Sequence, residues 1–170
     1  MHGKFVFLLA AVLLGGCATY HPSVPEDYRG ATSVIEDTET RIDDGKADLF
    51  YLTHVNGNRV KNSRSETQSW SYGQGNLLTT VLITHPVAAT EQTFSIIGRT
   101  IYAMPARALA STVYEVKGDV TFVPEPDVTY LIRGELTDER SSVWLERSDT
   151  GEVVETIEVE GSTSLGIFQK

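Results

Sequence analysis

Two aromatic side chains and an amide lie close together in a polar stretch and form the best candidate binding group. Trp70, Tyr72 and Asn76 fall within residues 61–76, a run of serines, glycines and other polar residues. Aromatic rings stack on sugars or anchor a protein partner, and a neighbouring amide supplies hydrogen bonds. Because aromatic rings are also common in protein interiors, a second interpretation stays open, in which Trp70 caps one end of the core.

No arrangement of residues predicts a catalytic site. A nucleophile elbow needs Gly-x-Ser-x-Gly between a strand and a helix, whereas residues 161–166 have another spacing and no helical pattern after them. Paired carboxylates for glycoside cleavage are defined by their separation in space, which the sequence does not give. The sequence therefore predicts no enzyme activity and no catalytic residue, and an envelope hydrolase is the weakest alternative.

The histidines and aspartates show no spacing typical of metal ligands. His21, His54 and His85 are far apart in the sequence, and His54 and His85 fall at turns or strand edges. Asp43 and Asp44 lie near Asp48 but lack the spacing of an EF-hand calcium loop, and a solvated turn explains them better. We therefore expect no metal site and no cofactor.

The single cysteine near the start of the chain supports a different kind of chemistry. Cys17 follows two glycines and an apolar run, residues 5–14, which itself follows a short positively charged start. This order is typical of a secretory signal peptide, and the apolar run is too short to span a bilayer. The segment resembles a bacterial lipoprotein signal with its lipobox. The resemblance implies that residues 1–16 are removed and that Cys17 becomes the lipidated N-terminus, with palmitate-type acyl chains.

Charge and cysteine count agree with a lipid anchor. Cys17 is the only cysteine, so no disulfide forms within one molecule, and acylation removes a lone thiol from an oxidising compartment. The net charge of −9 repels nucleic acid and anionic lipid head groups, so attachment to the membrane must come from the lipid. By resemblance to bacterial sorting rules, Ala18 in place of Asp favours the outer membrane, with the domain facing the periplasm. The alternative is an ordinary signal peptide with an incidental cysteine.

One all-β domain is predicted over residues 31–160. A flexible tether, residues 17–30, precedes it, and a small polar tail, residues 161–170, follows it. Residues 61–76 are predicted to be irregular, and a helical turn is plausible only within 104–112, where Pro105 suits a first helical position. Strands are expected near residues 32–35, 46–55, 58–60, 77–84, 92–102, 114–122, 130–136, 142–147 and 152–159.

Individual residues add detail to these strands. Asn56 and Gly57 are typical of a tight hairpin turn. Gly98 inside a strand indicates a bulge, and Gly118 on an apolar face leaves room for a bulky neighbour. Arg133 and Trp144 are expected to form a structural pair with the guanidinium over the ring.

About eight strands with short turns and little helix favour an antiparallel β-sandwich, immunoglobulin-like or transthyretin-like. The sequence blocks that carry a resemblance are the hairpin at Asn56-Gly57, Gly73-Gln74-Gly75, and residues 118–125, 130–136, 142–146 and 150–154. With these blocks the chain resembles a group of short, uncharacterised bacterial lipoproteins. The resemblance implies a single sandwich domain after a lipobox and transfers no catalytic residue.

These observations predict a lipid-anchored, non-catalytic accessory or protein-interaction module of the cell envelope, whose partner is an envelope protein. The alternative is a protein that binds a glycan or another small molecule through Trp70 and Tyr72. Exposure discriminates between them in part, because two buried rings would remove the reason for the glycan hypothesis.

Overall fold

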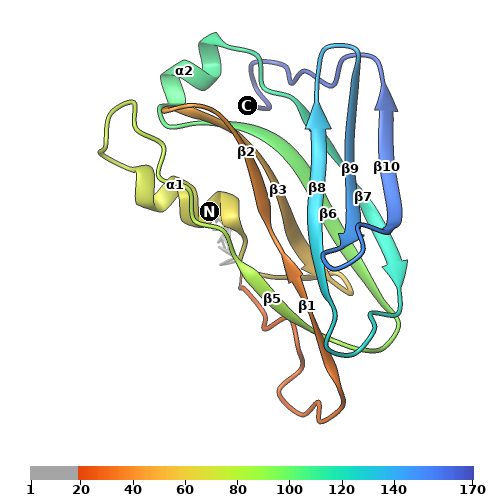
Figure 1. Cartoon of the computed structure of the whole chain (residues 1–170). Helices are drawn as coiled ribbons and strands as arrows, with labels where there is room; N and C mark the ends of the chain where they lie inside the picture. Colours follow the sequence, from red (N-terminus) through yellow and green to blue (C-terminus); the bar gives the residue numbers. More distant parts are fainter. Residues whose placement is uncertain (1–18) are drawn as a thin grey trace, which may run out of the picture.

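The computed structural model describes residues 19–170, which are built mainly of strands (Figure 1). Within these residues the chain forms ten strands, two short helices and two sheets. The predicted signal peptide, residues 1–16, and Cys17 lie outside the described residues. Neither helix of the described part is long and apolar enough to cross a membrane. The ten strands confirm the all-β prediction, and they are more than the sequence indicates.

The first sheet, sheet A, has the strand order β10–β9–β8–β1–β5. Its strands β1 and β8 pair in parallel, with Val34 opposite Thr129, so the prediction of a wholly antiparallel sandwich is wrong at this pair. Since the two strands are distant in sequence and no hairpin joins them, no turn signal could have revealed their pairing. The strands of sheet A are β1 (Thr32–Glu36), β5 (Thr84–Ala88), β8 (Thr129–Leu136), β9 (Arg140–Arg147) and β10 (Val153–Glu160).

The second sheet, sheet B, has the order β2–β3–β6–β7, and all of its pairs are antiparallel. The predicted hairpin turn after β3 is confirmed, since Asn56 and Gly57 both have positive φ, 51° and 76°, as a type I′ turn requires. The short strand β4 returns from this turn and pairs with β3. The strands of sheet B are β2 (Thr38–Asp43), β3 (Lys46–Val55), β4 (Asn58–Arg59), β6 (Gln92–Tyr102) and β7 (Glu115–Phe122).

The main hydrophobic core lies between the two sheets, and Phe50 fills a gap left by glycines on both sides of it. A Cβ atom on Gly98 would come within 3.0 Å of the Phe50 ring, and one on Gly134 of the facing sheet would overlap that ring. The bulge predicted at Gly98 is wrong, because Gly98 pairs in register with Phe50 and Val116. Gly98 is needed for close packing of an aromatic ring rather than for a kink.

Two further features concern a shift of register in β3 and the space left at Gly118. The register of β3 shifts between Leu52 and His54, so the bulge lies in the neighbouring strand. Gly118 makes room for a bulky neighbour, as predicted, since a Cβ there would lie 2.8 Å from Ile157 of β10. Gly98 and Gly118 therefore each leave space for a bulky side chain, Phe50 and Ile157 respectively.

Residues 61–76, predicted to be irregular, contain helix α1 (Ser63–Ser71). Asn62 caps it, because its side-chain oxygen accepts a hydrogen bond from the Ser65 amide at 3.1 Å. The buried positions of the helix are Ser63, Thr67 and Ser71. They are spaced four residues apart, as one face of a helix requires, but they are hydroxyl residues. The prediction failed because it depended on a repeat of apolar residues. The second helix, α2 (Pro105–Ala110), confirms the predicted helical turn, with Pro105 first.

Residues 77–83 run extended beside α1 instead of forming the start of a strand. The predicted strand at 77–84 is therefore wrong, and β5 begins only at Thr84 and continues past Pro86 at the edge of sheet A. The hydroxyls of Ser71, Thr67 and Ser63 accept hydrogen bonds from the amides of Thr79, Val81 and Ile83, at 3.0, 2.9 and 2.8 Å. We call this set of bonds the hydroxyl ladder.

The hydroxyl ladder works because two spacings match. Four helix residues advance about 6.0 Å along the axis, and two extended residues advance about 6.6 Å. Every second amide of an extended chain therefore meets every fourth side chain of a parallel or antiparallel helix. The ladder uses amides that would otherwise pair with a strand, and it fixes α1 to the domain.

Removing one rung of the ladder should destabilise the domain. Thr67 is fully buried, so Thr67→Val keeps the shape of the side chain but leaves the Val81 amide without a partner. We expect a loss of about 1 to 3 kcal/mol in the free energy of unfolding, measured by urea titration. Ser69→Ala, on the exposed side of the same helix, is the matched control and should change it by less than about 0.5 kcal/mol. Equal effects of the two substitutions would contradict a structural role for the ladder.

Candidate functional site

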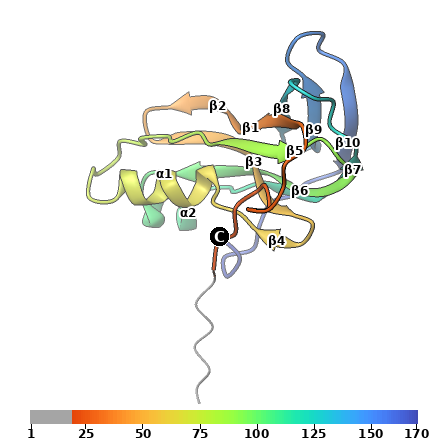
Figure 2. The same cartoon turned by 90° about the horizontal axis from the view of Figure 1, so that it is seen from below.

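Helices α1 and α2 cover the outer face of sheet B, away from the main core. Residues of β3 and β6 that point outward form a second, smaller hydrophobic cluster there, which includes Leu49, Tyr51 and Ile101 and is joined by Leu78. Both ends of the described chain lie near these helices (Figures 1 and 2). We call this side of the molecule, made of α1, α2 and the outer side of β3 and β6, the helix face.

A cavity of about 420 Å³ opens on the helix face between α1, α2 and β6; we call it the α1–α2 cavity. Its apolar wall includes Ile101, Leu109 and Val113. Polar residues of α1, Thr67, Gln68 and Ser71, also line the cavity. Cavities of about 300 to 1,000 Å³ with mostly apolar walls and a few polar groups are typical of small-molecule sites. The α1–α2 cavity has this size and character.

A second cavity, of about 430 Å³, lies beside the first and shares two of its wall residues, Arg64 and Gln68. Tyr51, His54 and Arg59 also line it. Burial raises the pKa of the Tyr51 hydroxyl to about 12, although the nearby guanidinium groups of Arg64 and Arg99 act in the opposite direction. The hydroxyl of Tyr51 is therefore protonated at neutral pH and is available as a hydrogen-bond donor.

The three residues predicted to bind a ligand occupy different positions on the helix face. Trp70 and Tyr72 are exposed, at 60% and 89% of their surface, so the interpretation of Trp70 as a cap on the core is wrong. Tyr72 lines the α1–α2 cavity, whereas Trp70 lines neither cavity. The Asn76 side chain accepts a hydrogen bond from Arg107 at 3.2 Å. Both rings are thus available to a partner, and one stands at the cavity.

The cations of the α1–α2 cavity differ in how their charge is balanced. Arg99 forms an ion pair with Glu115 and also donates to the Gln169 carbonyl at 3.2 Å. Burial raises the pKa of Glu115, but the hydrogen bond and charge of Arg99 outweigh this effect and hold the pKa below its ordinary value. Within residues 19–170 Arg64 forms no ion pair, and its Nε atom is buried without a hydrogen-bond partner. Arg64 thus lacks the carboxylate partner that Arg99 has.

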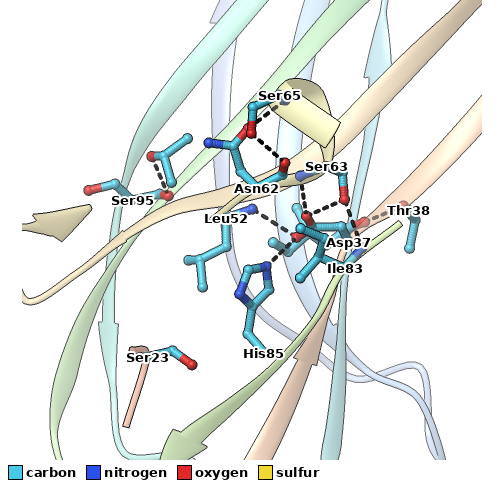
Figure 3. A network of polar contacts seen from close by, with 12 residues as sticks. Ser23, Asp37, Thr38, Leu52, Asn62, Ser63, Ser65, Ile83, His85 and Ser95 are labelled. Carbon is cyan, nitrogen blue, oxygen red and sulfur yellow. Dashed lines mark hydrogen bonds and ion pairs between the residues drawn. The ribbon is translucent and has the colours of Figure 1, made fainter. Parts of the chain in front are cut away.

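A buried carboxylate, Asp37, links both sheets and α1 (Figure 3). It stands in the one-residue link between β1 and β2. One of its oxygens accepts a hydrogen bond from the Leu52 amide at 2.9 Å, and the other accepts from the Ser63 amide at 3.2 Å and the Ser63 hydroxyl at 2.5 Å. His85 Nε2 lies 3.2 Å from the first oxygen, in a direction that does not meet hydrogen-bond geometry.

The group Ser63, Asp37 and His85 has the residue types of a catalytic triad but not its arrangement. In a triad the histidine stands between the serine and the acid and removes the serine proton. Here Asp37 stands between Ser63 and His85, and the Ser63 hydroxyl is used by Asp37 and by the Ile83 amide. All three side chains are buried. The geometry assigns them to holding the elements together, and His85 is a buried residue of edge strand β5.

The predicted pair of Arg133 and Trp144 is joined through a third residue. The two residues face each other across β8 and β9. Arg133 Nε donates to one oxygen of Glu146 at 3.3 Å, and Trp144 Nε1 donates to the other at 2.8 Å. Among the cation–ring contacts of residues 19–170, this pair does not occur. A shared carboxylate thus replaces the predicted stacking.

The described end of the predicted tether contacts the domain. The His21 amide donates to the Arg59 carbonyl at 2.8 Å, and the Tyr20 ring lies 4.9 Å from the Arg59 guanidinium. The Ser23 hydroxyl donates to the Pro86 carbonyl at 2.6 Å. Since Arg59 lines the second cavity, the chain passes beside the helix face before it enters β1.

Comparisons of the chain with protein families, curated proteins and solved structures found no match. Among residues 19–170, no group of three or more histidine, cysteine, aspartate or glutamate side chains is placed to hold a metal ion. The candidate site is therefore defined by the helix face itself, with its exposed rings, its two cavities and the charge of Arg64.

Proposed function

We propose that this chain is a lipid-anchored, non-catalytic module of the cell envelope that binds an envelope protein through the helix face. The anchor is an acylated Cys17 in the outer membrane, with the domain on the periplasmic side. The lipobox-like sequence before Cys17 supports this placement. The resemblance to short bacterial lipoproteins supports it as well. Within the same proposal, the two-sheet fold is a β-sandwich of immunoglobulin-like or transthyretin-like type.

The observation that carries the interaction proposal is the exposure of two aromatic rings on a fixed support. Trp70 and Tyr72 stand out from α1 and its C-terminal end with most of their surface free. The hydroxyl ladder and the Asn62 cap hold α1 in place. Aromatic side chains presented on a rigid element dominate many protein interfaces, because they bury large areas at low entropic cost.

Replacing both rings should abolish binding of the partner. We expect Trp70→Ala with Tyr72→Ala to remove the protein that is crosslinked in intact cells by a photoreactive residue at position 69. The matched control replaces Val153 and Val159, two exposed apolar residues of β10, by alanine and should leave the crosslinked product unchanged. If the double aromatic variant still captures the same envelope protein at the same yield, the interaction proposal is wrong.

A second candidate function is binding of a small molecule or glycan. The α1–α2 cavity favours it, because Tyr72 stands at a cavity of suitable size that Gln68 and three cationic residues also line. Under this function, ligand binding would depend on the residues that line the cavity, and it would persist in a variant that lacks the Trp70 ring.

A further inference from the structure

The α1–α2 cavity combines an apolar wall with positive charge in a protein that is otherwise acidic. The chain holds 14 lysines and arginines against 23 aspartates and glutamates. Nevertheless Arg64, Arg99 and Lys170 line this cavity and no acidic side chain does. The local charge is thus opposite to that of the whole protein. Such a cavity attracts an anion, and its apolar wall favours a ligand with a hydrophobic part.

Arg64 is the group best placed to bind that anion. Arg99 already pairs with Glu115, and the Lys170 amine donates to the carbonyls of Leu109 and Ser111. Arg64 forms no ion pair within residues 19–170, and its guanidinium lies beside the uncharged Tyr51 hydroxyl, so no carboxylate balances its charge. Guanidinium groups bind phosphate and carboxylate through two parallel hydrogen bonds. Since Arg64 lines both cavities, a ligand in either cavity can place its anionic group beside Arg64.

The proposed anchor places a source of amphiphiles beside this cavity. Tyr20 packs on Arg59, which lines the cavity that shares Arg64. Cys17 precedes Tyr20 by three positions in the sequence, and covalent geometry limits that separation to about 11 Å. A lipid attached to Cys17 therefore brings the membrane surface close to the helix face.

We propose that the α1–α2 cavity binds an anionic amphiphile, with Arg64 holding its phosphate or carboxylate head and the wall formed by β6 and α2 holding its alkyl chain. This inference deepens the small-molecule function proposed above and rests on it. The ligand comes either from membrane phospholipid or from a free fatty acid, since both share an anionic head and an alkyl chain.

Binding should require both head and chain. The chain from residue 17 with Cys17→Ser contains every strand and helix of the described part, residues 19–170, and carries no acyl chain, so it needs no detergent. Calorimetric titration with octyl phosphate below its micelle concentration should give saturable binding. Octyl glucoside, which lacks the charge, and inorganic phosphate, which lacks the chain, should each bind at least about tenfold more weakly.

Two variants connect this binding to the cavity. Arg64→Gln should weaken octyl phosphate binding at least about tenfold, since a charge-assisted hydrogen bond is lost. Ala108→Phe, which fills the cavity from α2, should weaken it with Arg64 intact. Arg133→Gln removes the same charge from β8, away from both cavities, and should leave it unchanged. Thermal unfolding checks that each variant is folded.

The proposal is overturned if octyl phosphate does not bind, if octyl glucoside binds equally well, or if Arg64→Gln and Arg133→Gln have the same effect. To identify the source, the acylated chain is placed in phosphatidylcholine vesicles containing either phosphatidic acid or dodecanoate. Mass spectrometry then identifies the amphiphile that remains bound, and loading in neither arm also overturns the proposal. Crosslinking from position 69 is independent of Arg64, so its outcome separates failure of the interaction function from failure of this one.

Discussion

Replacing Asp37 by alanine is expected to lower the free energy of unfolding by about 3 to 5 kcal/mol, because it removes one member of a buried polar group. The substitution takes acceptors away from the Leu52 and Ser63 amides and from the Ser63 hydroxyl. Each buried donor left without a partner costs about 1 to 3 kcal/mol. Since the carboxylate joins the link between the sheets to β3, α1 and β5, its loss should loosen all four elements.

Urea unfolding of the wild-type protein and of Asp37→Ala, monitored by circular dichroism, measures this loss as a lower urea concentration at the midpoint for the variant. Asp119→Ala is the matched control, because Asp119 is an exposed aspartate whose side chain, within residues 19–170, bonds only to the Ser95 hydroxyl. It should change the free energy of unfolding by less than about 0.5 kcal/mol. A midpoint for Asp37→Ala equal to that of Asp119→Ala would contradict the role given to Asp37.

The second large effect is expected at Phe50. Phe50→Ala should lower the free energy of unfolding by about 3 to 5 kcal/mol, since it leaves a cavity between the sheets that glycines cannot fill. Gly98 and Gly134 contribute no side chain to close the space around the ring. Differential scanning calorimetry measures the effect as a fall in melting temperature. Ile42→Ala, at an exposed position of β2, is the control and should shift it little.

A double-mutant cycle tests whether the glycines are there for the ring. A Cβ on Gly134 would also lie 2.5 Å from the Ser142 carbonyl oxygen, so Gly134→Ala should destabilise the wild-type chain. In Phe50→Ala the overlap with the ring is gone, so Gly134→Ala should cost less there. Strictly additive effects of the two substitutions would show that Phe50 and Gly134 do not share one packing space.

Strands with regular alternation could be predicted from the sequence almost to the residue. The alternating runs at 114–122 and 130–136 nearly coincide with β7 and β8, because each strand turns its apolar side chains toward the core at every second position. The Asn56-Gly57 turn was equally clear, since few other residues adopt positive φ at both positions. These features depend on local chemistry, and local chemistry is what a sequence shows directly.

Elements held by polar contacts could not be predicted in the same way. Strand β2 consists almost entirely of charged residues and threonines, and it is a strand because it pairs along the edge of β3. Helix α1 buries hydroxyls instead of apolar side chains. The residues that could have revealed α1 are Asn62 as a cap and Ser63, Thr67 and Ser71 at a spacing of four.

The candidate site was only partly accessible from the sequence. Trp70 and Tyr72 could be selected because aromatic rings in a polar segment are unusual, but their exposure is known only from the fold. Arg64 carried no signal, since its importance comes from a missing partner and from walls contributed by β6, α2 and the C-terminal residues. Asp37 and His85 were likewise indistinguishable from ordinary turn and edge residues.

The measurement that tests the central claim most directly is the intact mass of the protein extracted from membranes of cells that produce the full chain. A lipid-anchored module should begin at Cys17 and carry more than one acyl chain on that residue, because a single chain does not anchor stably. The same chain with Cys17→Ser should appear in the soluble fraction or retain residues 1–16. A wild-type protein recovered in soluble form with an unmodified Cys17, or cleaved elsewhere, would contradict the account.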